Sequence, residues 1–129
     1  MTAIHRIEIP IPFPIGSVNL YFIKDSIPTL IDAGFYSGDS LRRVSVALEN
    51  AGCRLSDVKR ILLTHGHLDH VGLAGKISKI SGAEIFVHPL DRSKSFWDLE
   101  KEQGKGMESF LGFLRKAGLP ETLMRTLSA

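Results

Sequence analysis

A dense cluster of metal-ligand side chains lies in the middle of the chain. Residues 64–72 read Thr-His-Gly-His-Leu-Asp-His-Val-Gly, so three of the five histidines fall close together with an aspartate between them. Imidazole and carboxylate groups are ligands for Zn²⁺, and also for iron or manganese. Four such side chains on one tight loop would be costly to bury unpaired, so the cluster predicts a metal site. Its members are His65, His67, Asp69 and His70.

The spacing of these residues predicts two groups of ligands. His65 and His67 are two residues apart in expected extended chain, so their rings can point to the same side. Asp69 and His70 lie at the expected turn into a helix and can project to a different side. One short loop can therefore offer two nitrogens to one metal ion, and an oxygen and a nitrogen to a second.

The segments on either side of the loop would position it. Residues 61–63 form a short, continuous apolar run, which is typical of a strand covered on both faces. We expect a helix from near Asp69 to Ile80, closed by Gly82. Because α/β proteins place ligand-binding groups at the C-terminal ends of strands, this loop lies where a site is expected.

Strands and helices alternate over the first 89 residues. Further strands are expected over 6–11, 18–24, 29–33 and 84–88. Prolines interrupt pairing after the first of these, which indicates an edge strand or an extended arm. A helix capped by Ser37 or Asp39 should stop at Gly52. The order β, β, β, α, β, α, β predicts a mixed α/β fold with helices covering the sheet.

Several of these segments together resemble one known family. The sequence His65-Gly66-His67-Leu68-Asp69-His70 matches the His-x-His-x-Asp-His signature of the metallo-β-lactamase fold superfamily. The flanking residues 61–64 and 71–72 are similar to it, and residues 30–34 resemble the family's early strand ending in Asp-x-Gly. The resemblance extends to Pro89, and its general appearance is closest to the glyoxalase II-like hydrolase branch.

The resemblance implies a role for each residue of the cluster. His65 and His67 match ligands of a first metal ion, and Asp69 and His70 match ligands of a second. Asp69 is also placed to orient the attacking water or to take its proton. Asp32 would support the site from outside the ligand set, because a carboxylate commonly holds a ligating imidazole in one tautomer. Without the resemblance, Asp32 would be interpreted as a turn-forming residue before Gly34.

The resemblance covers only part of the family's fold, an αββα sandwich of two similar halves with the metals at their seam. Residues 1–89 resemble the amino-terminal half, residues 90–129 resemble a helical connecting segment, and the second half is absent. The family's later ligands, a further His for each metal and a bridging Asp, have no counterpart. His88 comes too early and is interpreted as structural. The chain is therefore expected to be a fragment of a longer hydrolase, a natural short protein without catalysis, or a homodimer in which two copies bury each other's open sheet face.

A completed site would imply a zinc-dependent hydrolase. One or two Zn²⁺ ions, or iron or manganese instead, would hold a hydroxide that attacks a small-molecule thioester, ester, lactone or phosphoester. The 129-residue chain alone is expected to be inactive. The alternative is a catalytically inert half-domain that binds metal or assembles with itself.

The overall composition argues against several other classes of protein. Hydrophobic residues make up 43% and charged residues 23%, which are ordinary globular values. A net charge of +2 gives no support for a nucleic-acid or acidic-membrane partner. No apolar run approaches the roughly 18 residues that a membrane span needs. The single Cys53 and the lack of a visible signal peptide predict a cytoplasmic protein.

Overall fold

The structure is a computed structural model, and it describes residues 1–11, 14, 16–92, 115, 118, 120–122 and 125. The connecting segment predicted over 90–129 therefore lies largely outside the described residues. Within them, none of the helices is long and apolar enough to cross a membrane.

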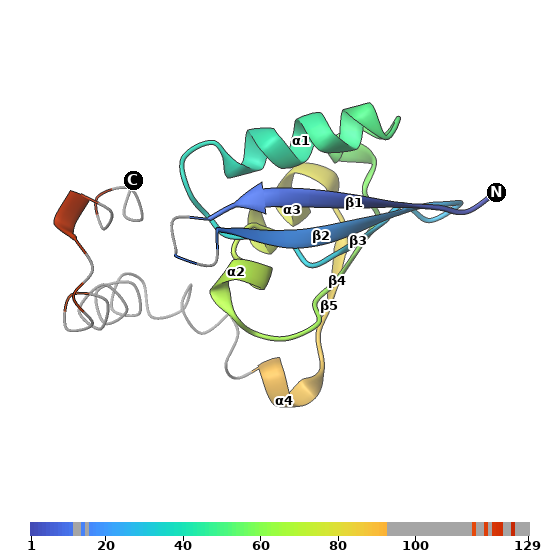
Figure 1. Ribbon diagram of the computed structural model, residues 1–129. Helices are drawn as coiled ribbons and strands as arrows, with labels where there is room; N and C mark the ends of the chain where they lie inside the picture. The colour runs from blue at the N-terminus through green and yellow to red at the C-terminus, as the bar shows by residue number, and fades with distance from the viewer. Residues whose placement is uncertain are drawn as a thin grey trace.

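A five-stranded sheet, with its strands in sequence order, forms the framework of the fold (Figure 1). The strands are β1 (Ala3–Pro10), β2 (Ser17–Lys24), β3 (Thr29–Ile31), β4 (Arg60–Leu62) and β5 (Glu84–Phe86). β2 is antiparallel to its neighbours β1 and β3, whereas β3, β4 and β5 are parallel to one another. The predicted order of strands and helices is confirmed, and β1 is an edge strand that pairs with β2 along its whole length.

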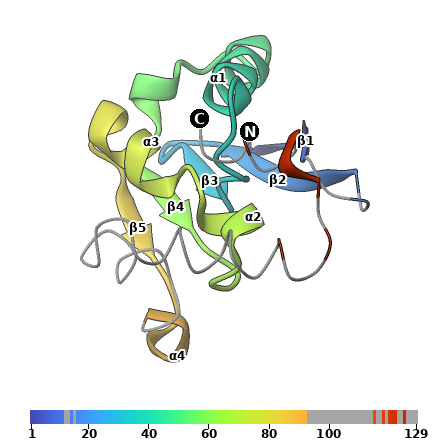
Figure 2. The ribbon, with the colours of Figure 1, turned by 90° about the vertical axis from the view of Figure 1, so that its left-hand side faces the viewer.

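Helices lie between and after the strands. They are α1 (Ser40–Asn50), the 3-10 helix η1 (Leu55–Asp57), α2 (Leu68–Val71), α3 (Ala74–Ser81) and α4 (Pro89–Arg92). The helices α1, α2 and α3 lie against the sheet, whereas α4 projects beyond the end of β5 (Figures 1 and 2). One apolar core fills the space between sheet and helices, and its largest fully buried members include Phe22, Leu30, Leu48, Ile61 and Ile77.

The opposite face of the sheet carries a row of exposed apolar side chains. Tyr21, Ile31, Leu62 and Phe86 pair in register across β2, β3, β4 and β5. Tyr21, Leu62 and Phe86 are 41%, 37% and 43% exposed. The prediction that the apolar run 61–63 is covered on both faces is therefore wrong. Successive strand residues point to opposite faces, and the described helices cover only the face toward which Ile61 points.

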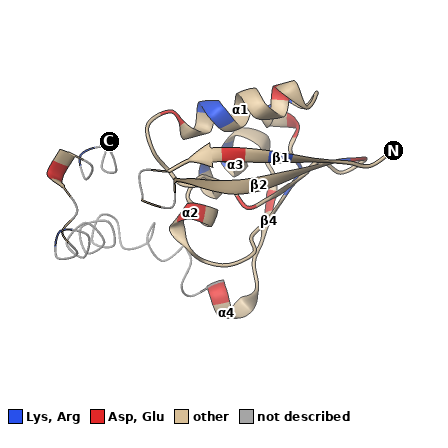
Figure 3. Cartoon of the chain, viewed as in Figure 1, with Lys and Arg blue, Asp and Glu red and all other residues tan. Residues whose placement is uncertain are grey.

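The start of α1 also differs from the prediction. Asp39 is the residue before the helix, but its side chain caps no backbone N–H. It instead accepts hydrogen bonds from Arg43 and Arg42, which lower the pKa of its carboxyl below the ordinary value. Across the described elements, basic and acidic residues are interspersed rather than gathered by sign (Figure 3).

The single helix predicted over 69–80 is two helices in the structure. Gly72 and Leu73 separate α2 from α3, and Gly82 closes α3 with a φ of 72° as predicted. A Cβ added at Gly72 would lie 2.6 Å from the Tyr36 nitrogen and 2.8 Å from the Gly34 carbonyl oxygen. The segment after β3 thus packs directly on the backbone at Gly72, an approach that only glycine permits.

We expect Gly72→Ala to lower the free energy of unfolding by about 1–3 kcal/mol, because the added methyl group forces a backbone shift. Gly75→Ala is the matched control, since a Cβ at this position in α3 meets nothing within 4 Å. It should be neutral or stabilise the fold by about 0.5–1 kcal/mol. Urea unfolding monitored by circular dichroism measures both, and equal midpoints would contradict the packing described for Gly72.

Candidate metal centre

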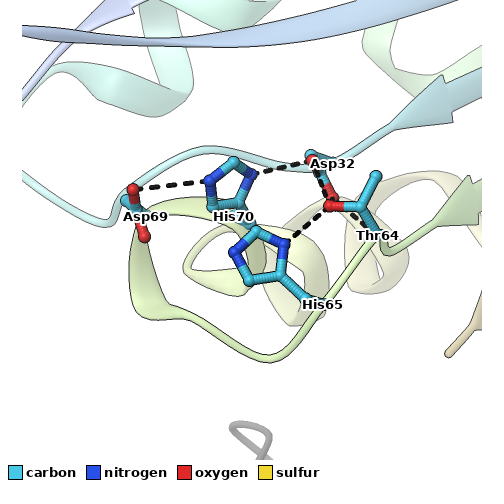
Figure 4. A network of polar contacts seen from close by, with 5 residues as sticks. All are labelled: Asp32, Thr64, His65, Asp69 and His70. Carbon is cyan, nitrogen blue, oxygen red and sulfur yellow. Dashed lines mark hydrogen bonds and ion pairs between the residues drawn. The ribbon is translucent and has the colours of Figure 1, made fainter. Parts of the chain in front are cut away.

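The predicted site residues gather where β3 and β4 end. Asp32 directly follows β3, His65 and His67 lie between β4 and α2, and Asp69 and His70 belong to α2. Figure 4 shows Asp32, His65, Asp69 and His70 side by side. Because β3 and β4 are parallel neighbours, their C-terminal ends meet at the same edge of the sheet. The structure therefore brings Asp32 into contact with His70, which lies 38 positions further along the chain.

The carboxylate of Asp32 connects these segments. Its side chain is only 6% exposed. It accepts hydrogen bonds from the Thr64 backbone N–H at 2.8 Å, from the Thr64 hydroxyl at 2.8 Å, and from His70 Nδ1 at 2.8 Å. These three donors satisfy a group that would be costly to bury alone. Asp32 thus does more than form the turn before Gly34.

The backbone of Asp32 is unusual as well. Its φ of 60° is the only positive value at a non-glycine residue in the described part of the chain. Aspartate adopts this left-handed region more readily than most residues, but the conformation persists only where the surroundings hold it. Here the Asp32 N–H donates to the Leu62 carbonyl, and the next N–H, that of Ala33, donates to the His70 carbonyl.

The three histidine rings of the loop lie close to one another. The ring centres of His65 and His70 are 4.1 Å apart, and those of His65 and His67 are 4.6 Å apart. His70 Nε2 lies 3.4 Å from a carboxylate oxygen of Asp69, and the two side chains are 21% and 25% exposed. The four residues predicted as ligands therefore share one patch that solvent can reach.

The donors in this patch suit a divalent metal ion by their chemistry. Thr64 contacts His65 Nδ1 and Asp32 contacts His70 Nδ1, which leaves the Nε2 atom of each ring facing away from these partners. Among the described residues, however, no group of three or more His, Cys, Asp or Glu side chains is arranged to hold an ion. The loop offers ligand types that fit zinc without a complete coordination set.

The sequence does not predict the contacts of Thr64. A hydroxyl residue next to the first histidine was the available signal, but its partner Asp32 is 32 positions away. His88, which we interpreted as structural, is exposed and accepts a hydrogen bond from the Leu90 N–H at Nδ1.

The fold and the patch define an α/β protein with a histidine-rich loop at the ends of two parallel strands. A family model described as "Metallo-beta-lactamase superfamily" matches residues 14–121. The chain belongs to the metallo-β-lactamase superfamily. "Probable metallo-hydrolase YqjP" of Bacillus subtilis is 31% identical to it over 126 residues, which cover 95% of this chain and 40% of YqjP.

Solved structures support the same assignment. The metallo-beta-lactamase family protein TTHA1429 from Thermus thermophilus matches with a TM-score of 0.69 and 30% identity, over 97% of this chain and 42% of that one. BJP-1, a subclass B3 metallo-beta-lactamase of Bradyrhizobium japonicum, matches with a TM-score of 0.58 and 28% identity, over 70% and 31%. The predicted fold class is confirmed, and the chain spans less than half the length of these relatives.

We expect Asp32→Ala to lower the free energy of unfolding by at least about 2 kcal/mol, because hydrogen bonds to a charged group contribute about 1.5–3 kcal/mol each. Asp32→Asn keeps one acceptor oxygen and should lose less. Asp39→Asn, at an exposed carboxylate, is the control and should leave the unfolding midpoint nearly unchanged. If Asp32→Ala unfolds at the same urea concentration as the control, the carboxylate does not hold the three segments together.

Proposed function

We propose that the chain is the amino-terminal half of a metal-dependent hydrolase. The observation that carries this proposal is the gathering of His65, His67, Asp69 and His70 at one sheet edge, with His70 anchored on the buried Asp32. Membership of the superfamily supports it, and so does the description of YqjP as a probable metallo-hydrolase.

Each residue has a proposed role. His65 and His67 would bind one ion, and Asp69 and His70 a second, with zinc the first choice for these donors and iron or manganese the alternatives. When bound, such ions supply Lewis acidity and lower the pKa of a coordinated water to about 7. Asp69 is the carboxylate that would orient the attacking water or accept its proton. The substrates that fit this chemistry are thioesters, esters, lactones and phosphoesters.

The missing ligands are proposed to come from protein that covers the open face of the sheet. The row formed by Tyr21, Ile31, Leu62 and Phe86 is an apolar strip of the kind that marks an interaction surface. A second βα half of the same protein is the proposed cover. A second copy of the chain is the other proposed cover, because a two-fold axis can bury the same surface on both copies. It would not by itself supply the missing ligand types.

The proposal is tested on the full-length protein that contains this chain. We expect His65→Ala to weaken zinc binding at least about tenfold, measured by competition with a chromophoric chelator, because it removes a direct ligand. His88→Ala is the matched control, since His88 is exposed and lies outside the loop. It should bind zinc as the unaltered protein does.

The same preparations are assayed on a thioester, a lactone and a phosphodiester. Turnover that is present in His88→Ala and lost in His65→Ala would support the hydrolase. Zinc binding without turnover of any substrate would favour the inert half-domain. An unaltered protein that retains no zinc, iron or manganese would contradict both the hydrolase and a metal-binding half-domain, and would favour a half-domain that only assembles with itself.

A further inference from the structure

The hydrogen bonds around Thr64 determine which nitrogen of His65 is free. We propose that Thr64 is a positioning residue that holds His65 in the Nδ1–H tautomer, so that Nε2 is the atom available to a metal ion. The tautomer itself follows from the contacts of the described residues. Only its use in metal binding rests on the proposed function.

The Thr64 hydroxyl contacts both Asp32 and His65. The oxygen Oγ1 lies 2.8 Å from Asp32 Oδ2, 3.0 Å from Asp32 Oδ1 and 2.8 Å from His65 Nδ1 (Figure 4). A hydroxyl has one proton to donate, and an ionised carboxylate only accepts. The Thr64 proton therefore points to Asp32.

His65 is consequently the donor in its contact with Thr64. Because the Thr64 proton is already used, Oγ1 can only accept a hydrogen bond from His65 Nδ1. Nδ1 must then carry a proton, and a neutral imidazole has only one N–H. The lone pair of His65 is therefore on Nε2, since the bond made by one ring nitrogen sets the state of the other.

The same carboxylate orients a second histidine. His70 Nδ1 lies 2.8 Å from Asp32 Oδ2, so it donates its proton directly, and its Nε2 faces Asp69. The Thr64 backbone N–H also donates to Asp32 Oδ1 at 2.8 Å, which keeps the hydroxyl beside the carboxylate. Asp32 thus orients His70 directly and His65 through Thr64.

We call the chain of hydrogen bonds from Asp32 through Thr64 to His65 the relay. It requires a hydroxyl group at residue 64, not merely a side chain of threonine's shape. Thr64→Val keeps the branched shape and removes the hydroxyl, whereas Thr64→Ser keeps the hydroxyl. A residue with only a packing role would tolerate valine at least as well as serine. The two variants therefore separate the relay from packing.

The test uses metal-free, full-length protein labelled with ¹⁵N-histidine, at a pH where the imidazoles are neutral. Long-range ¹H–¹⁵N correlation spectra distinguish the two tautomers of each ring. In the unaltered protein and in Thr64→Ser, we expect the Nδ1–H form at both His65 and His70. In Thr64→Val, His65 should shift toward the Nε2–H form that free imidazole favours, while His70 keeps the Nδ1–H form.

His70 is the internal control, because its unchanged signal shows that Asp32 and the loop remain in place. The proposal is overturned if His65 of the unaltered protein is in the Nε2–H form, or if Thr64→Val leaves its tautomer unchanged. Should Thr64→Val not fold, the spectra of the unaltered protein and of Thr64→Ser still decide the assignment.

Zinc affinity, measured by chelator competition, is the second readout. Thr64→Val should bind zinc about tenfold more weakly, as is usual when the partner of a ligating histidine is removed, and Thr64→Ser should bind as the unaltered protein does. Nδ1–H at His65 in a protein that binds no zinc, iron or manganese would support the tautomer and contradict the proposed function. Nε2–H at His65 in a zinc-binding protein would overturn the relay alone.

Discussion

One buried carboxylate holds the candidate site together. Asp32 ends the β3 segment, accepts hydrogen bonds from Thr64 after β4, and accepts another from His70 in α2. Removing this group would leave three part-buried donors without their partner, which costs at most about 1–3 kcal/mol for each. The left-handed backbone conformation of Asp32 also costs free energy, and the surrounding hydrogen bonds hold the residue in it. The position of the histidines therefore depends on the geometry of a residue that is itself outside the proposed ligand set.

A second constraint is the one-sided covering of the sheet. The described helices pack on the face that includes Phe22, Leu30 and Ile61, and the register of four strands places an apolar row on the other face. The chain aligns with less than half of YqjP and of TTHA1429, so these relatives contain further protein that has no counterpart in the aligned segment. The proposed second half of the protein would account both for the open face and for the incomplete set of ligands among the described residues.

The order of strands and helices could be predicted because it depends on local patterns of apolar residues and on prolines and glycines. The break between α2 and α3 could not, because it results from the close approach of Gly72 to the backbone near Gly34 and Tyr36. The exposure of Leu62 was missed for a similar reason. An apolar run of three residues does not predict how many faces of the strand are covered, since that depends on which helices pack against the sheet.

The sequence by itself determined the candidate ligands and the family, because His65, His67, Asp69 and His70 lie within a few residues of one another and their spacing is local. Only the tertiary structure decided how these side chains are oriented. The parallel pairing of β3 with β4 brings Asp32 to Thr64 and His70, and those hydrogen bonds define which ring nitrogens face outward. The contacts of Asp32 with Thr64 and His70 join residues more than thirty positions apart. They depend on which strands pair in the sheet, and the local pattern of residues does not specify that pairing.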